Sequence, residues 1–146
     1  MLNIQFFTGW TALTFCLATF APAPSVSAAA SSEPVRPRVI VLTDISNEPD
    51  DEESLVRFLV YANEFDVEGL VATTSVWLRD KVRPDIIRHT VEAYGQVHSN
   101  LLLHAPGYPP ANQLLGLVKT GLPEFGMKGV GKGKTSEGSR HIIAMV

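Results

Sequence analysis

Acidic side chains gather in one short stretch of the sequence. Six carboxylates lie within ten residues, at Asp44, Glu48, Asp50, Asp51, Glu52 and Glu53. Carboxylates that are forced together repel one another, so one of them must take a proton or a cation must lie between them. A set of oxygen ligands alone suits Ca²⁺ or Mg²⁺ better than zinc. The sequence therefore predicts that Asp44 and Asp51 bind a metal ion or a substrate.

A simpler role for part of this stretch stays open. Asp50 or Asp51 could cap the amino end of a helix and complement its dipole, an effect of about 0.5–2 kcal/mol. Asp50 and Glu53 also have the spacing of a capping pair. We expect Glu52 and Glu53 to lie on a solvated helix face. Asp44 differs from these residues, because helix capping does not require a carboxylate at the end of a strand.

The acidic stretch lies between an expected strand and an expected helix. Residues 38–43 form a continuous aliphatic run, which is typical of a parallel strand buried on both faces. One stripe of a helix follows, made of Leu55, Phe58, Leu59 and Ala62. Asp44 ends the strand, and Asp50 and Asp51 begin the helix. Ligands of open α/β sheets bind at this position, beyond the carboxyl ends of the strands.

Strands and helices continue to alternate along the chain. We expect a second strand at 67–72, a second helix at 84–97, a third strand at 101–105, a short helix at 111–118, a loop at 126–138 and a helix from 139. This order predicts an α/β fold, a mostly parallel sheet with flanking helices. Three strands would leave an unpaired sheet edge, so we interpret 38–146 as the amino-terminal portion of a larger domain.

The charge distribution limits the class of partner. The formal net charge is −3, and a nucleic-acid-binding domain would normally be basic. Residues 33–78 contain three basic and ten acidic side chains, whereas residues 79–146 contain nine and five. The negative charge is therefore concentrated where the first strand meets the first helix, and we expect no nucleic-acid partner.

The amino-terminal segment has the features of an export signal. Residues 1–32 contain no Lys, Arg, Asp or Glu, and Trp10 to Phe20 form an apolar run of about eleven residues, too short to span a bilayer. Val26-Ser27-Ala28 fits the small-residue pattern at which signal peptidase cleaves. We predict a signal peptide at 1–28, a linker at 29–37 and a secreted or periplasmic product without membrane attachment. An uncleaved anchor and a segment of the fold are the alternatives.

Several linked motifs resemble one family. They are Val39 to Asp44, Asn47 to Asp51, Glu68 to Ser75, Trp77 to Asp80, Arg83 to Asp85 and His104 to Pro109. Together they resemble the nucleoside hydrolases and, more closely, the nucleoside hydrolase-like domain of the Sde182-type cellulose-binding proteins. The resemblance extends from about Arg38 to the last residue. It implies an α/β fold and hydrolysis of an N-glycosidic bond assisted by Ca²⁺.

The resemblance also implies roles for single residues. Asp51 matches a calcium ligand and Asp50 a residue that holds ribose hydroxyls. Asp44 is nearest to the aspartate that binds calcium and activates water, although its spacing is two residues longer, and Ser46 and Asn47 compete for that place. The further calcium ligands of nucleoside hydrolases come from segments beyond residue 146.

Three more side chains complete the predicted substrate site. Asn47 and Thr74 are candidates for substrate binding, and Thr74 lies in a Thr-Thr-Ser run where nucleoside hydrolases carry an asparagine. Trp77 could stack on a sugar or base, or it could pack against the next helix.

Two functions follow from these residues. The first is an exported, Ca²⁺-dependent N-glycosidase-like hydrolase, in which the carboxylates stabilise a cationic sugar and Asp44 deprotonates a water. The second is a non-catalytic carbohydrate-binding module that keeps the fold. In both cases the partner is a small nucleoside or a carbohydrate, and self-association into a homo-oligomer stays open.

Overall fold

The computed structural model describes residues 35–146, and the predicted signal peptide and residues 29–34 of the predicted linker lie outside this range. The elements follow in the order β1 (Arg38–Thr43), α1 (Pro49–Leu59), η1 (Ala62–Glu64), β2 (Asp66–Ala72), α2 (Pro84–His104), α3 (Ala111–Leu117), β3 (Val118–Thr120), η2 (Gly126–Gly129) and α4 (Glu137–Met145). Both η elements are short 3₁₀ helices. The prediction of an α/β fold is confirmed.

The three strands form one parallel sheet in the order β1-β2-β3. Thr43 at the end of β1 is paired with Ala72 at the end of β2, and Ala72 is paired with Thr120 at the end of β3. All three strands therefore end at the same edge of the sheet, and the loops that follow them meet there. The pairing of β1 with β2 shifts by one residue between Val39 and Ile40.

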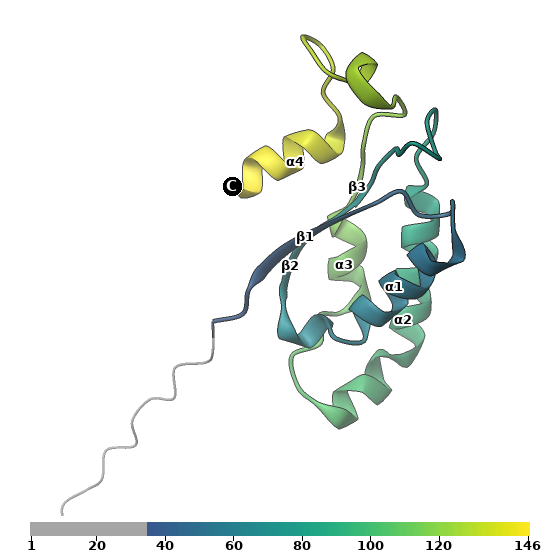
Figure 1. The fold of residues 1–146 in the computed structure, drawn as a ribbon. Coiled ribbons are helices and arrows are strands. Elements are labelled where there is room, and N and C mark those ends of the chain that lie inside the picture. The colour runs from purple at the N-terminus through teal and green to yellow at the C-terminus, as the bar shows by residue number, and fades with distance from the viewer. Residues whose placement is uncertain (1–34) are drawn as a thin grey trace, which may run out of the picture. The chain divides into compact units, whose positions relative to one another are not determined.

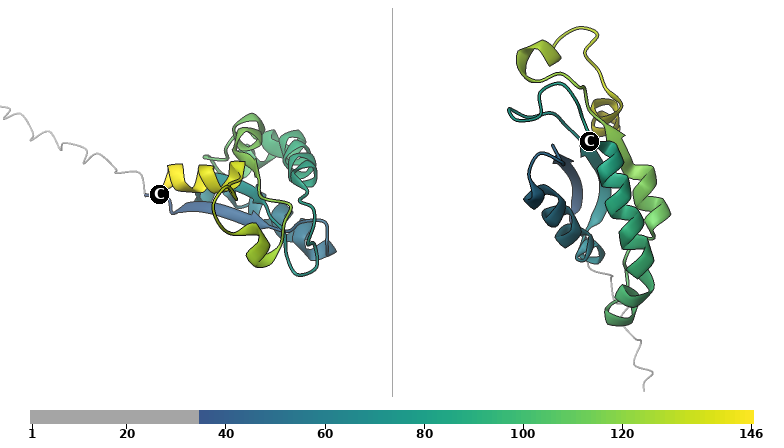
Figure 2. Two further views of the ribbon diagram at one scale, coloured as in Figure 1. Left: turned by 90° about the horizontal axis from the view of Figure 1, so that it is seen from above. Right: turned by 90° about the vertical axis from the view of Figure 1, so that its right-hand side faces the viewer.

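Helices cover both faces of the sheet (Figures 1 and 2). Leu70 and Ala72 of β2 join a buried apolar core with side chains of α1, α2 and α3. The opposite face of β2 carries Gly69 and Val71, and α4 lies over it. A side chain at Gly69 would meet the ring of His141, which shows how closely α4 approaches the sheet.

The third predicted strand is wrong. Residues 101–105 do not form a strand, because α2 continues to His104, and the third strand is β3 at Val118–Thr120. The reason is the helical period, since Ile87, Val91, Tyr94 and Leu101 all pack in or against the core. Leu102 and Leu103 are exposed on the outer side of the same helix. Three consecutive leucines indicate a strand by their local pattern, but only Leu101 packs inward.

Three smaller expectations also need correction. Strand β1 is not buried on both faces, because Leu42 is exposed. Helix α1 begins at Pro49 with Glu48 as its N-cap, which makes no side-chain capping bond, so Asp50 and Glu53 do not form a capping box. The loop at 126–138 contains η2.

Within residues 35–146, no helix is both long and apolar enough to cross a membrane.

Tyr94 offers a test of the packing between α2 and the segment before α3. Its side chain is buried, and its hydroxyl donates a hydrogen bond of 2.7 Å to the carbonyl of Pro109. Two causes raise the pKa of Tyr94 to about 12: burial is the larger, and the charge of the nearby Tyr108 is the smaller. An unfolded tyrosine ionises near pH 10, so the unfolded state is favoured as the pH rises from about 10 to 12.

We expect Tyr94→Phe to lower the free energy of unfolding at pH 8 by about 1 kcal/mol, because the hydrogen bond is lost. The difference from the wild type should shrink by pH 11, where the unfolded wild-type chain gains from ionisation of Tyr94. Urea unfolding at pH 8 and at pH 11 measures this difference in the free energy of unfolding. An equal difference at pH 8 and pH 11 would contradict the raised pKa.

Candidate functional site

The acidic loop is shaped by contacts on both of its sides. Ile45 is fully buried, and its N–H donates to the hydroxyl oxygen of Thr43 at 3.1 Å. Ser46 adopts a positive φ of 86°, a left-handed conformation that is uncommon for residues other than glycine. The loop therefore leaves β1, buries one apolar side chain and turns sharply before α1 begins.

Asp44 and Asp51 are brought close enough to interact. Both are half-buried, whereas Asp50 is exposed. Burial raises the pKa of Asp51 above its ordinary value, and the negative charge of Asp44 raises it further. The loop thus holds two carboxylates under mutual repulsion, which a cation or a proton would relieve.

Asp51 also lines a hollow between β1 and α1. This hollow has a volume of about 240 Å³ and is lined by Val41, Leu42, Thr43, Asp51, Ser54, Leu55 and Phe58. Most of these side chains are apolar, so a charged group bound by Asp51 would be only partly solvated. Such surroundings strengthen an electrostatic interaction relative to bulk water.

The carboxylates of the loop supply part of a possible metal site. Within residues 35–146, no group of three or more His, Cys, Asp or Glu side chains is arranged to hold one. The oxygen chemistry of Asp44 and Asp51 suits Ca²⁺, which takes six to eight oxygen ligands. The described residues therefore fit part of a coordination shell and do not complete it.

The end of β2 places Thr74 and Trp77 at the same edge of the sheet. The N–H of Thr73 donates to the carbonyl of Thr43 at 2.8 Å, which ties the end of β2 to the end of β1. Thr74 is half-buried. The hydroxyl of Ser75 accepts hydrogen bonds from the N–H groups of Trp77 and Leu78, both at 3.1 Å.

This turn separates the two apolar side chains that follow it. Leu78 is buried, whereas Trp77 is 72% exposed. The alternative in which Trp77 packs against the next helix requires a covered indole. The exposure of Trp77 does not fit this alternative. Its apolar surface is free to contact a ligand.

Arg83 contacts the acidic loop, although it was not among the site residues predicted from the sequence. Its Nη1 donates to the hydroxyl of Ser46 at 3.4 Å, and its Nη2 pairs with Asp85 at 2.7 Å. This hydrogen bond lowers the pKa of Asp85. The guanidinium therefore links the acidic loop to the first turn of α2. The Arg83 to Asp85 motif was the signal, but only the fold shows that it reaches Ser46.

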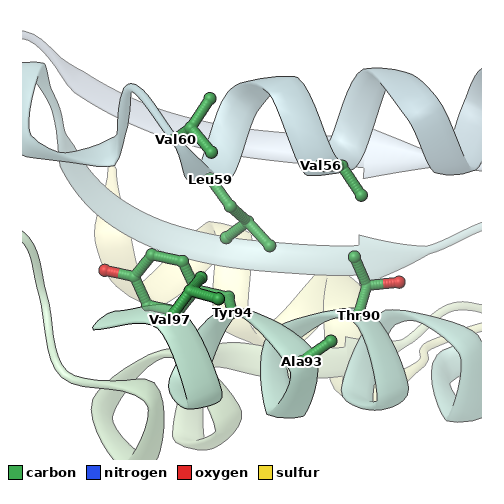
Figure 3. A pocket seen from close by; sticks show the side chains of 7 residues that line it. All are labelled: Val56, Leu59, Val60, Thr90, Ala93, Tyr94 and Val97. Carbon is green, nitrogen blue, oxygen red and sulfur yellow. The ribbon is translucent and has the colours of Figure 1, made fainter. Parts of the chain in front are cut away.

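The apolar pocket in Figure 3 is a separate feature. It lies between α1 and α2 and has a volume of about 160 Å³. Its lining consists of Val56, Leu59, Val60, Thr90, Ala93, Tyr94 and Val97. The hydroxyls of Thr90 and Tyr94 are bonded to the backbone carbonyls of Ile86 and Pro109. The pocket therefore offers no free reactive group, and we place the candidate site at the acidic loop.

The parallel sheet and its flanking helices define an α/β protein. Over residues 38–146 the sequence matches the family described as cellulose-binding Sde182, nucleoside hydrolase-like domain, and the chain belongs to that family. No curated protein matches the chain.

A solved structure shows the same fold. It is a nucleoside hydrolase-related hypothetical protein from Saccharophagus degradans that is associated with carbohydrate metabolism. The two proteins are 43% identical, with a TM-score of 0.73 over 76% of this chain. The match covers 27% of the other protein, so this chain spans about a quarter of its length.

Proposed function

We propose that the protein is an exported hydrolase that cleaves an N-glycosidic bond of a nucleoside-type substrate with the help of Ca²⁺. The observation that carries this proposal is the proximity of Asp44, which follows β1, to Asp51 in the first turn of α1. Burial and then the charge of Asp44 raise the pKa of Asp51. Two carboxylates held together in this way favour a bound cation. Membership in a nucleoside hydrolase-like family supports the same reaction class.

Each residue of the proposed site would have a separate role. Asp44 would accept the proton of the attacking water, as a positioned general base does. Asp44 and Asp51 would hold the Ca²⁺ ion, and their negative charge would also stabilise a sugar that becomes cationic as the bond breaks. Bound Ca²⁺ would supply positive charge that orients sugar hydroxyls and acidifies water. Asp50, Asn47 and Thr74 would hydrogen-bond the sugar, and Trp77 would stack on a ring.

A second function, carbohydrate binding without catalysis, is favoured by a different observation. Ser46 and Asn47 occupy the loop between Asp44 and α1, and neither a hydroxyl nor an amide is an effective base near neutral pH. The family description names cellulose binding. In this case the loop would bind a sugar and leave its bonds intact.

One experiment separates the two functions. The full-length protein is incubated with inosine or uridine, and released ribose is measured with added Ca²⁺ and with a chelator. Turnover that requires Ca²⁺ supports the hydrolase. Binding to cellulose with no release of ribose supports the second function.

Asp51→Ala tests the site itself. We expect this variant to lose Ca²⁺ binding measured by calorimetry, because one of two paired carboxylates is removed. Its unfolding temperature without Ca²⁺ should not fall, since the variant also loses the repulsion between Asp51 and Asp44. Glu52→Ala is a matched control from the same turn of α1, and it should bind Ca²⁺ like the wild type. Unchanged Ca²⁺ affinity in Asp51→Ala would contradict the proposed metal role.

A further inference from the structure

A second hollow lies at the same edge of the sheet, between the loops that follow β2 and β3. Its walls are formed by Arg79, Asp80, Pro123, Glu124, Phe125, Met127 and Lys128. Its volume is about 460 Å³, which falls within the range of small-molecule sites. None of its residues belongs to the site around Asp44 and Asp51, so the hollow is a separate feature.

Contacts between the two loops hold this hollow open. The N–H of Phe125 donates to the carbonyl of Arg79 at 3.0 Å. The guanidinium carbon of Arg79 lies 5.7 Å from the centre of the Phe125 ring, and its Nε donates to the carbonyl of Val76 at 2.7 Å. Glu124 pairs with Lys134 within the second loop. Because both loops are tied in this way, a ligand would meet a surface that is already ordered.

The charges around the hollow balance one another. Arg79 and Lys128 are cationic, and Asp80 and Glu124 are anionic. Such a lining offers donors and acceptors for hydrogen bonds without attracting one sign of charge. The hollow therefore suits a neutral ligand that carries many hydroxyl groups.

Apolar surface is exposed beside these polar groups. Met127 is 82% exposed, and Phe125 is also exposed. A sugar ring has a C–H face that packs on such side chains and a rim of hydroxyls that needs polar partners. The hollow offers both, since four of its seven lining residues are charged and Phe125 and Met127 are apolar.

We propose that this hollow is a binding subsite for a neutral oligosaccharide, distinct from the Asp44 and Asp51 site. The proposal rests on the carbohydrate association described under Proposed function, and it assigns that association to the loops after β2 and β3. Binding here uses hydrogen bonds and apolar packing, so it does not require Ca²⁺.

The test is calorimetric titration of the full-length protein with cellohexaose, with Ca²⁺ and with a chelator. We expect the same affinity under both conditions. Phe125→Ala and Met127→Ala should each weaken binding by about fivefold to tenfold, from the loss of apolar packing. Phe125→Tyr should restore binding, because it keeps an aromatic ring. Tyr61→Ala is the control, since Tyr61 is an exposed aromatic residue outside the hollow.

Met127→Ala keeps the test decisive if Phe125→Ala disturbs the fold, because the exposed Met127 side chain contributes little to packing. Full affinity in Met127→Ala and Phe125→Ala would overturn the subsite. So would tighter binding of hexagalacturonate than of cellohexaose, since that would show a preference for an anionic ligand. A wild-type protein that releases ribose but does not bind cellohexaose would overturn the subsite and leave the proposed hydrolase standing.

Discussion

Replacement of Asp44 by asparagine is expected to lower kcat/KM for ribose release by the full-length protein by about 10²–10⁴-fold, the usual contribution of a general base. Asparagine keeps the shape of the side chain, but it can neither accept a proton at neutral pH nor contribute a negative charge. The same change removes the negative charge that adds to the effect of burial in raising the pKa of Asp51. The prediction is measured by steady-state kinetics at saturating Ca²⁺.

The control for this variant is Glu53→Gln. Glu53 is exposed on α1, so neutralising it changes the charge of the acidic stretch by the same amount without touching the pair. We expect its kcat/KM to match the wild type. An equal loss in both variants would show that activity depends on the overall negative field. No loss in Asp44→Asn would remove Asp44 from the reaction.

The largest expected effect on stability comes from Ile87→Ala in the middle of the core. Ile87 of α2 is fully buried and packs in the cluster that joins α2 to β2 and α1. Removal of its buried carbons leaves a cavity, and such changes cost about 2–5 kcal/mol. Urea unfolding followed by circular dichroism measures the change in free energy.

Ile143→Ala is the matched control, because it makes the same substitution on a helix surface. Ile143 of α4 is 75% exposed, so its free energy of unfolding should change by about 0.5 kcal/mol or less. Equal effects at both positions would mean that Ile143 is covered in the protein in solution. A small effect at Ile87 would contradict the core described above.

Local sequence pattern predicted much of the framework correctly. The aliphatic run at 38–43 is β1, the stripe that contains Leu55 and Leu59 lies on the buried side of α1, and residues 111–117 form α3. These features depend on neighbours within one or two turns, where hydrophobic period and proline placement are informative. The position of Asp44 at a strand end could be predicted for the same reason.

Other features depend on which elements meet in space. Leu101 lies in a helix because α2 continues beyond its buried residues and places this side chain against the core. No local signal distinguishes three leucines in a strand from three in a helix. The contact of Arg83 with Ser46 joins residues 37 positions apart. The hollow between Arg79 and Phe125 likewise forms only because β2 and β3 are parallel neighbours and their loops leave the same edge.

The alternation of strands and helices, the resemblance to nucleoside hydrolase-like domains and the concentration of carboxylates after β1 can all be read from the amino-acid sequence. Packing in three dimensions sets which of those carboxylates are half-buried and close to one another. Asp44 and Asp51 share an electrostatic environment because the loop buries Ile45 and turns at Ser46, whereas Asp50 remains exposed to solvent. Spacing along the chain fixes neighbours within a helix or strand, but burial and distance across a loop depend on how the whole sheet is packed.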